Sequence, residues 1–247
     1  MDSTCLLNII AKAQGLKVLA GDVGNAYLNA ETNEKVYCIC GLEFGPDMEG
    51  RIAIIKKGLY GLKSSGAQWH AHFARTLCTL CFNPTRFDPD VWYKLREDNK
   101  RHDYISTYVD DFLITAKDPW VYMKVLQEIY TIKNPSIPDY YLGANYVGNV
   151  ESNWYITAKQ YILESIKHIE TRLNITLREE RTPMATKDHP EEDSSPLLDS
   201  FHHPEYQAVI GMLQWVITIS RADVCYATSA LSRFSTAPRE GHLSRDL

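Results

Sequence analysis

Three aspartates occupy positions from which they could bind divalent cations. Asp22 ends a short apolar run, and Asp110 and Asp111 follow it by 88 and 89 residues. These two acids separate the apolar runs Tyr104–Val109 and Phe112–Thr115, which we predict to pair as a tight hairpin with both acids at its tip. Carboxylates at the ends of neighbouring strands project to one side of a sheet. Asp22 and Asp110 could there hold two Mg²⁺ ions about 3.5–4 Å apart, which activate a hydroxyl and stabilise a leaving phosphate oxygen.

A purely structural interpretation of the same acids is also open. Asp110-Asp111 would then be an ordinary polar turn, and Asp22 an ordinary strand end. The apolar flanks, Tyr108-Val109 and Phe112–Ile114, favour the metal site because they would hold the carboxylates rigidly over a core. From the residues alone, both interpretations stand.

Periodicity and turn signals predict the elements that must position these acids. The order of strands and helices indicates an α+β fold, an antiparallel sheet covered by helices on one face. Trp69 and Trp92 fall within apolar patterns and are predicted to lie in the core. The predicted helices are Ser3–Gly15, Gly66–Leu80, Asp118–Ile132, Lys159–Leu173, Tyr206–Ile219 and Arg221–Phe234. The other predicted strands are Lys17–Asp22, Val36–Cys40, Arg51–Ile55, Val91–Leu95, Tyr140–Val147 and Trp154–Thr157.

Composition and charge restrict the classes of protein to consider. The 247 residues are 45% hydrophobic and 23% charged, which excludes a wholly disordered or collagen-like chain. The net charge is −5, yet residues 51–101 hold ten Lys or Arg against four Asp or Glu. Such a basic block could track the phosphates of a nucleic acid, or it could be a solvated basic surface.

From the apolar runs, the first residues and the cysteines, we expect an intracellular protein that is neither secreted nor membrane-bound. No apolar run approaches the roughly 18–20 residues of a membrane span. The start, Met1–Thr4, lacks the basic segment of a secretory signal. The six cysteines are too sparse for a disulfide scaffold in a chain of this length.

Three blocks of sequence carry a family resemblance. Tyr108–Asp111 resembles the Y-x-D-D signature of reverse transcriptases, and Asp22–Asn29 resembles their D-V-x-x-A-[YF]-L-N motif. Leu59–Ser65, followed by Trp69, is similar to the L-Y-G-L-K-x-S…W block of copia-type (pseudoviral LTR) retrotransposons. Further blocks fall in the family's order: Phe87–Asp90, Tyr141–Gly143, Arg181–Met184, Tyr206–Gly211 and Arg221–Asp223.

This resemblance implies an RNA-directed DNA polymerase that transfers nucleotides to a primer 3′-hydroxyl with two Mg²⁺ ions, for which Mn²⁺ could substitute. By matching position, Asp22 and Asp110 would bind both metals together with the backbone carbonyl of Val23, and Asp111 would be the auxiliary acid. The implied partners are an RNA or DNA template with its primer and deoxynucleoside triphosphates. The implied location is the cytoplasm, within retrotransposon particles.

The resemblance also implies residues that contact nucleotide and template. Tyr27 takes the position of a steric gate against a 2′-hydroxyl, although a buried core aromatic is the alternative. Tyr60, Gly61 and Lys63 would lie beside the nascent base pair, although Lys63 could instead be solvated. The remaining members of this predicted set are Tyr108, beside the acids, and Lys133, near where polymerases place a lysine that protonates pyrophosphate.

The implied domain organisation is a polymerase palm with partial fingers, followed by a helical thumb and connection. We expect palm and residual fingers over 1–135, a primer-grip hairpin and thumb helix over 136–181, an acidic Pro-rich linker over 182–205 and a helical connection over 206–247. Family members carry further finger residues before the first helix here. The resemblance thus implies a fragment with exposed apolar surface and weak or no isolated activity.

Two other classes of function remain open at this stage. The chain could be an inactive relic that still binds nucleic acid, or an unrelated α+β protein whose acids hold Ca²⁺ or Mg²⁺ for structure. Salt-dependent binding to primer–template separates the first of these from the second.

Overall fold

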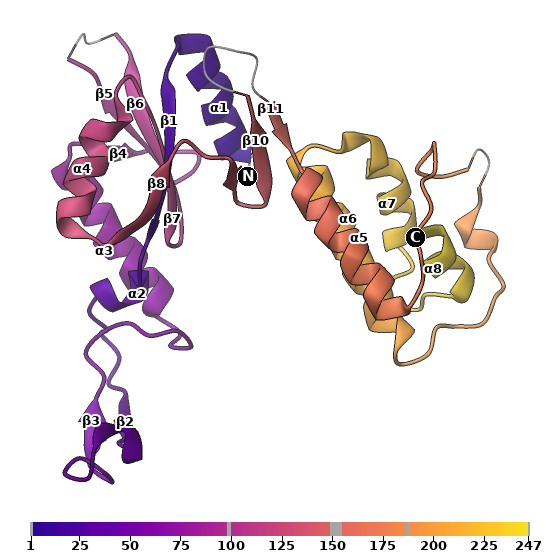
Figure 1. The fold of residues 1–247 in the computed structure, drawn as a ribbon, viewed down its shortest axis with the longest axis horizontal. Helices are drawn as coiled ribbons and strands as arrows, with labels where there is room; N and C mark the ends of the chain where they lie inside the picture. Colours follow the sequence, from indigo (N-terminus) through magenta and orange to yellow (C-terminus); the bar gives the residue numbers. More distant parts are fainter. Residues whose placement is uncertain (1, 98–99, 149–154, 186–187, 247) are drawn as a thin grey trace. The chain divides into compact units, whose positions relative to one another are not determined.

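The computed structural model describes residues 2–97, 100–148, 155–185 and 188–246. The chain divides into two compact units, Asp2–Pro138 and Asp139–Leu247. Figure 1 colours the first from indigo to magenta and the second from magenta to yellow. No helix in the described part of the chain has both the length and the apolar content needed to span a lipid bilayer.

The first unit is built on a six-stranded sheet in the order β4-β5-β6-β7-β1-β8, and each neighbouring pair is antiparallel. The predicted antiparallel sheet is therefore confirmed. Asp22 and Asp111 lie on the neighbouring strands β1 and β7, each of which pairs with a strand on both sides. The strands are β1 (Lys17–Val23), β4 (Asn83–Pro84), β5 (Val91–Leu95), β6 (His102–Tyr108), β7 (Asp111–Ala116) and β8 (Ile132–Ser136).

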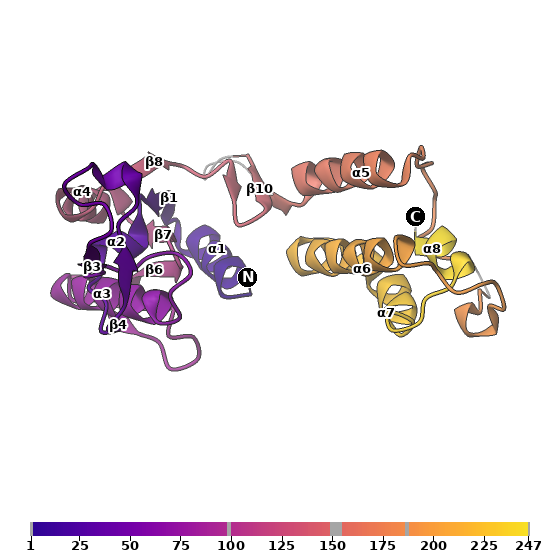
Figure 2. The same cartoon turned by 90° about the horizontal axis from the view of Figure 1, so that it is seen from below.

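Helices cover both faces of this sheet, so the prediction of one covered face is wrong. In Figures 1 and 2, α1 lies on one side of the sheet, and α3 and α4 lie on the other. Phe112 and Ile114 of β7 belong to the core that includes residues of α3 and α4, whereas Leu113 and Thr115 point to the opposite face and are equally buried. The helices are α1 (Asp2–Gln14), α2 (Ala26–Asn29), α3 (Ser65–Thr79) and α4 (Pro119–Ile129).

One predicted boundary in this unit fails for a tertiary reason. The helix expected to run to Ile132 ends at Ile129, because Ile132 belongs to β8. There Ile132 pairs with Val23 and Lys133 pairs with Asp22 of β1. Pairing with a distant strand thus overrides the local helical pattern.

A separate two-stranded ribbon, β2 (Tyr37–Ile39) and β3 (Ile52–Ile54), confirms the predicted strand pair. Its apolar side chains are not covered. Tyr37 pairs with Ile54 and Ile39 with Ile52, and all four are 64–70% exposed. The ribbon therefore presents apolar surface to solvent.

The second unit has a small sheet in the order β11-β10-β9 and a group of helices. Trp154, the predicted first residue of the strand Trp154–Thr157, lies outside the described residues. Helix α8 was not predicted, and α6 begins four residues before the predicted Tyr206. The elements are β9 (Tyr140–Tyr141), β10 (Ala144–Val147), β11 (Tyr155–Thr157), α5 (Lys159–Leu173), α6 (His202–Ile219), α7 (Cys225–Ser232) and α8 (Glu240–Asp246).

The acidic segment, for which the sequence predicts a linker, contacts α8 within this unit. Arg245 of α8 forms ion pairs with Asp188 and Asp193. His242 is buried, and its Nε2 lies 2.9 Å from the carbonyl oxygen of Pro190. Two acids of the predicted linker thus have a cationic partner on the helix that the sequence analysis missed.

Candidate active site

Strand pairing brings the predicted acids together. Asp22 of β1 is the register partner of Asp111 of β7, which is also the partner of Tyr108 at the end of β6. Directly opposed residues in antiparallel strands have Cα atoms about 4.5–5.5 Å apart. Residues 88 or more positions apart in the sequence therefore share one end of the sheet, which is the condition on which a joint cation site depends.

The hairpin tip differs from the prediction by one residue. Val109 and Asp110 form the turn, whereas Asp111 is the first residue of β7, so only one of the two acids lies at the tip. Val109 has a φ of +56°, a conformation that costs a β-branched residue about 1–3 kcal/mol.

Both carbonyl groups of this turn accept hydrogen bonds from other elements. The backbone N–H of Val23 donates to the carbonyl oxygen of Asp110 at 2.8 Å. The indole N–H of Trp69, on α3, donates to the carbonyl oxygen of Val109 at 2.5 Å. The turn is therefore held from β1 on one side and from α3 on the other.

The three carboxylates interact electrostatically. Burial first, and then the charges of Asp110 and Asp22, together raise the pKa of Asp111 to about 6. Such mutual repulsion is the ordinary consequence of placing acids side by side. A bound cation would relieve it.

Asp22 has one oxygen with a cationic neighbour and one without a donor. Its Oδ2 lies 3.5 Å from Nζ of Lys133, the register partner on β8. Its Oδ1 is buried and has no hydrogen-bond partner among the described residues. A buried carboxylate oxygen without a donor is costly, and it suits a metal ligand.

The donor set fits a substrate-assisted Mg²⁺ site better than a site made by protein alone. Among the described residues, no three His, Cys, Asp or Glu side chains are grouped so as to hold a metal ion. Mg²⁺, however, commonly takes one or two carboxylates and completes its shell with water and substrate phosphates. Asp22 and Asp110 would be the two carboxylates of a site of that kind.

The residues predicted to contact nucleotide form a second group. The rings of Tyr27 and Tyr60 are in contact, with centroids 4.6 Å apart. Tyr27 also packs against the core, so it has both a buried side and a neighbour in the predicted template-facing loop. Gly61 has a φ of +97°, which a glycine adopts without strain.

Lys63 is not brought to the carboxylates by any contact between described residues. It lies near Glu34, whose pKa is lowered first by hydrogen bonds from Ser64 and then by the charge of Lys63. The loop itself is closed by Ser65, whose hydroxyl bonds the backbone N–H and carbonyl oxygen of Leu59. The loop is thus tied to the first turn of α3.

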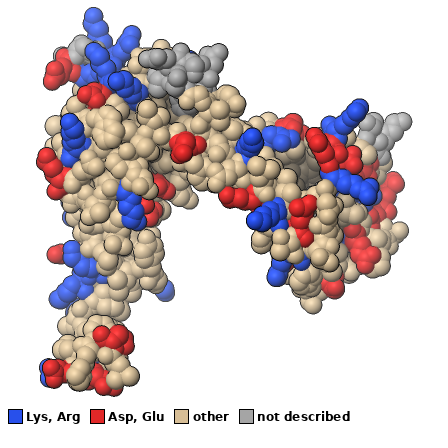
Figure 3. Space-filling view, viewed as in Figure 1, with Lys and Arg blue, Asp and Glu red and all other residues tan. Residues whose placement is uncertain are grey.

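The basic block is only partly available to a ligand. Figure 3 shows Lys and Arg gathered at the β5–β6 end of the first unit, and Asp and Glu at the tip of the β2–β3 ribbon. Arg96, however, is largely buried against Asp103, and the ammonium of Lys94 lies over the rings of Phe82 and Tyr122. These two cations have structural partners, and the others of the block remain candidates for phosphate contacts.

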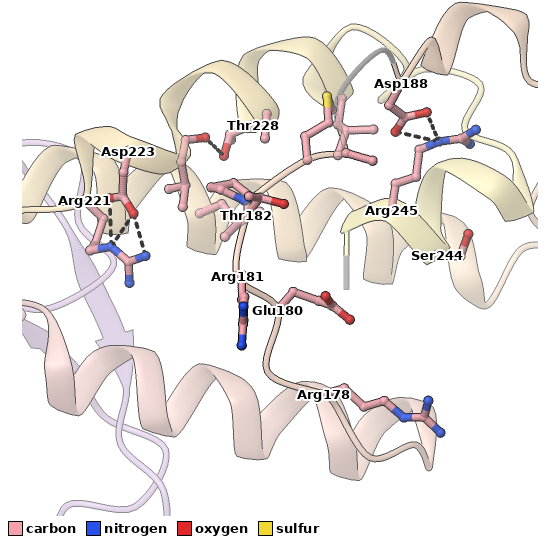
Figure 4. Close-up of a pocket in the computed structure, with 17 residues that line it drawn as sticks. Arg178, Glu180, Arg181, Thr182, Asp188, Arg221, Asp223, Thr228, Ser244 and Arg245 are labelled. Carbon is pink, nitrogen blue, oxygen red and sulfur yellow. Dashed lines mark hydrogen bonds and ion pairs between the residues drawn. The ribbon is translucent and has the colours of Figure 1, made fainter.

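A cavity of about 520 Å³ lies in the second unit, and none of Asp22, Asp110 and Asp111 lines it. It is lined by two of the blocks noted above, Arg181–Met184 and Arg221–Asp223. Figure 4 shows that Arg221 is bonded to Asp223 and Arg245 to Asp188. Two of the arginines that line it are therefore already neutralised by carboxylates.

Comparison with known proteins shows the family of the chain. Residues 1–184 match the family described as reverse transcriptase (RNA-dependent DNA polymerase). The chain belongs to the reverse transcriptase family. Its relatives are Ty/copia-type transposon proteins, which confirms the copia-type resemblance.

Three of these reverse transcriptase relatives show how much of each protein the chain covers. A transposon Ty5-1 protein of Saccharomyces cerevisiae is 29% identical over 229 residues, covering 90% of this chain and 71% of that protein. The Pol polyprotein from transposon RE1 of Arabidopsis thaliana is 29% identical over 232 residues, covering 90% and 15%. That from transposon TNT 1-94 of Nicotiana tabacum is 24% identical over 250 residues, covering 94% and 18%. The chain thus spans less than a fifth of these two polyproteins.

The sequence analysis of this reverse transcriptase chain missed one residue of the site. Trp69 was predicted as core, and it is 1% exposed, but its N–H also bonds the turn that carries Asp110. Its place in the L-Y-G-L-K-x-S…W block was the available signal. Val109, at the tip, was treated only as an apolar flank.

The raised pKa of Asp111 predicts a pH dependence of stability. Between about pH 4 and 6 the folded chain keeps a proton that the unfolded carboxyl, with its ordinary pKa of 3.8, has released. Rising pH therefore destabilises the folded state through this group. The stability of Asp111→Asn relative to wild type should increase across that interval and level off above it, measured by urea unfolding without divalent cations. A difference that stays constant with pH would contradict the coupling.

Proposed function

We propose that residues 1–135 form the palm, with residual fingers, of an RNA-directed DNA polymerase that extends a primer on an RNA or DNA template. The observation that carries this is the register of β1 and β7, which sets Asp22 opposite Asp111 with Asp110 in the adjoining turn. Family membership supports the same reaction.

In this proposal, Asp22, Asp110 and the carbonyl of Val23 hold the two divalent cations. Mg²⁺, or Mn²⁺ in its place, supplies activation of the primer hydroxyl and neutralisation of the developing phosphate charge. Asp111 adds negative charge from β7. Its raised pKa supports a site that is completed by cations.

Lys133 is the proposed proton donor to the leaving pyrophosphate. Its ammonium is already at the site, 3.5 Å from Oδ2 of Asp22, and its side chain is 57% exposed. A flexible lysine in that position can turn from the carboxylate to a phosphate oxygen when the substrate enters.

The tyrosines and the loop after β3 form the proposed nucleotide and template surface. Tyr27 is the steric gate, packed between the core and Tyr60. Gly61 and Lys63 lie on the same loop as Tyr60 and would face the template. Tyr108, which is 59% exposed beside the acids, completes the surface.

The second unit would supply the primer grip, at the hairpin over 140–147, and the thumb with α5. The acidic segment 182–205 and the connection over 206–247 would follow. By analogy with the transposon origin of the relatives, we place the protein in the cytoplasm, within retrotransposon particles, with primer–template and deoxynucleoside triphosphates as its partners.

A non-catalytic protein that binds nucleic acid is the second candidate. It is favoured by one observation: Lys and Arg gather at the β5–β6 end of the first unit, which suits contacts with phosphates and requires no cation site. Such a relic would bind primer–template in a salt-dependent way and extend no primer.

The assay is extension of an oligo(dT) primer on poly(rA) with dTTP and Mg²⁺. Asp110→Asn removes a proposed metal ligand, and extension should fall by at least about 100-fold. The matched control is Asp47→Asn, the same chemical change at an exposed acid between β2 and β3, which should leave extension unchanged.

The outcomes of this assay separate the candidates. Equal extension by wild type and Asp110→Asn would refute the proposed site. Binding of primer–template without extension in Mg²⁺ or Mn²⁺ would favour the relic. Absence of both binding and extension would contradict both candidates.

The gate assignment predicts a change in sugar selectivity. Tyr27→Ala removes the ring, so the preference for dTTP over UTP, as a ratio of kcat/KM values, should fall about tenfold or more. Tyr27→Phe keeps the ring and should retain the preference. If Tyr27→Ala lowers stability and leaves selectivity unchanged, Tyr27 is a core aromatic only.

A further inference from the structure

Trp69 is a core residue that contacts the Val109–Asp110 turn. Its ring is 1% exposed and packs on Phe73 and Tyr130, with centroids 5.2 and 5.6 Å away. The hydroxyl of Tyr130 is in turn 2.6 Å from that of Thr76 on α3. These contacts fix the orientation of the indole.

The acceptor of the indole N–H is the carbonyl of Val109, the residue with the unfavourable φ of +56°. A buried indole N–H needs an acceptor, and a strained turn needs external support, so one hydrogen bond serves both. The next carbonyl, that of Asp110, is held by the N–H of Val23. With both carbonyls held, the backbone orientation of Asp110 is fixed from two sides.

The same helix begins at the loop proposed to face the template. Ser65 is the first residue of α3. Its hydroxyl accepts a hydrogen bond from the backbone N–H of Leu59 and donates one to the backbone carbonyl of Leu59. Trp69 is one turn further along α3. The helix therefore connects this loop to the turn that carries Asp110.

We propose that Trp69 is a positioning residue that holds the Val109–Asp110 turn in its strained conformation and thereby sets the direction of the Asp110 carboxylate. This rests on the proposed function, because the turn matters to turnover only if Asp110 is a metal ligand. The hydrogen bond and its effect on the turn are independent of catalysis.

Trp69→Phe keeps a buried ring and removes the N–H. Trp92→Phe is the matched control, because Trp92 is 3% exposed and its indole nitrogen has no hydrogen-bond partner among the described residues. The N–H of Val23 donates to the Asp110 carbonyl and so reports on the turn. In Trp69→Phe, hydrogen exchange of this amide should be at least about tenfold faster than in wild type, with exchange in α4 unchanged. Trp92→Phe should leave exchange at the turn unchanged.

The kinetic measurement distinguishes positioning from general stability. Displacing a catalytic carboxylate by about 1 Å can cost up to about 100-fold in rate, so kcat of Trp69→Phe should fall by about 10–100-fold. KM for primer–template should stay within about twofold, because the binding surface is intact. A loss of activity that only follows the unfolded fraction would overturn the proposal.

A second variant tests the strain directly. Glycine adopts positive φ without strain, so Val109→Gly should restore slow exchange at the turn, and part of the lost kcat, to Trp69→Phe. A double variant as impaired as Trp69→Phe alone would mean that Trp69 acts through the core.

The exchange and kinetic measurements can fail separately. If wild type extends no primer, the proposed function fails, and exchange at the turn still decides the role of Trp69. If Trp69→Phe does not fold, scalar coupling across the hydrogen bond between Trp69 Nε1 and the Val109 carbonyl carbon is measured in wild type. Absence of that coupling overturns the proposal, and its presence with fast exchange of the Val23 amide does so too.

Discussion

The antiparallel register of β1 and β7 is the constraint on which the candidate site depends. It places Asp22 opposite Asp111 and brings the N–H of Val23 to the carbonyl of Asp110. Because side chains alternate along a strand, a slip of one residue would turn Asp22 to the other face and separate the acids. Gly21 helps to fix the register, since a Cβ there would meet Cζ of Phe112 at 2.6 Å.

Grouping the acids has an electrostatic cost that the rest of the fold must offset. The raised pKa of Asp111 and the buried, unpartnered Oδ1 of Asp22 are two expressions of that cost. Lys133 offsets part of it through its ion pair with Asp22, and the apolar interior of β7 keeps the strands in place. The fold thus accepts a loss of stability at these acids, as is common where a fold carries function, and a bound cation would reduce that loss.

Much of the candidate site could be predicted from local sequence, because the acids, their apolar flanks and the two-residue turn are short-range signals. The second covered face of the sheet was also signalled, since the continuous apolar run at 112–114 of β7 indicates burial on both sides. Strand β8 and helix α8 could not be predicted in this way. Strand β8 exists through pairing with β1, and α8 through contacts that include the pairing of Arg245 with distant acids. Apolar patterning likewise predicts that Trp69 is buried and says nothing about which carbonyl receives its N–H.

The central claim is that Asp22 and the Asp110 turn form one cation site, and paramagnetic broadening by Mn²⁺ tests it most directly. In ¹⁵N-labelled protein, substoichiometric Mn²⁺ should first broaden the amide signals of residues 22–23 and 110–111, and Asp22→Asn should remove that broadening. Broadening confined to the acidic segment 188–193, or broadening at 110–111 that persists in Asp22→Asn, would contradict the account.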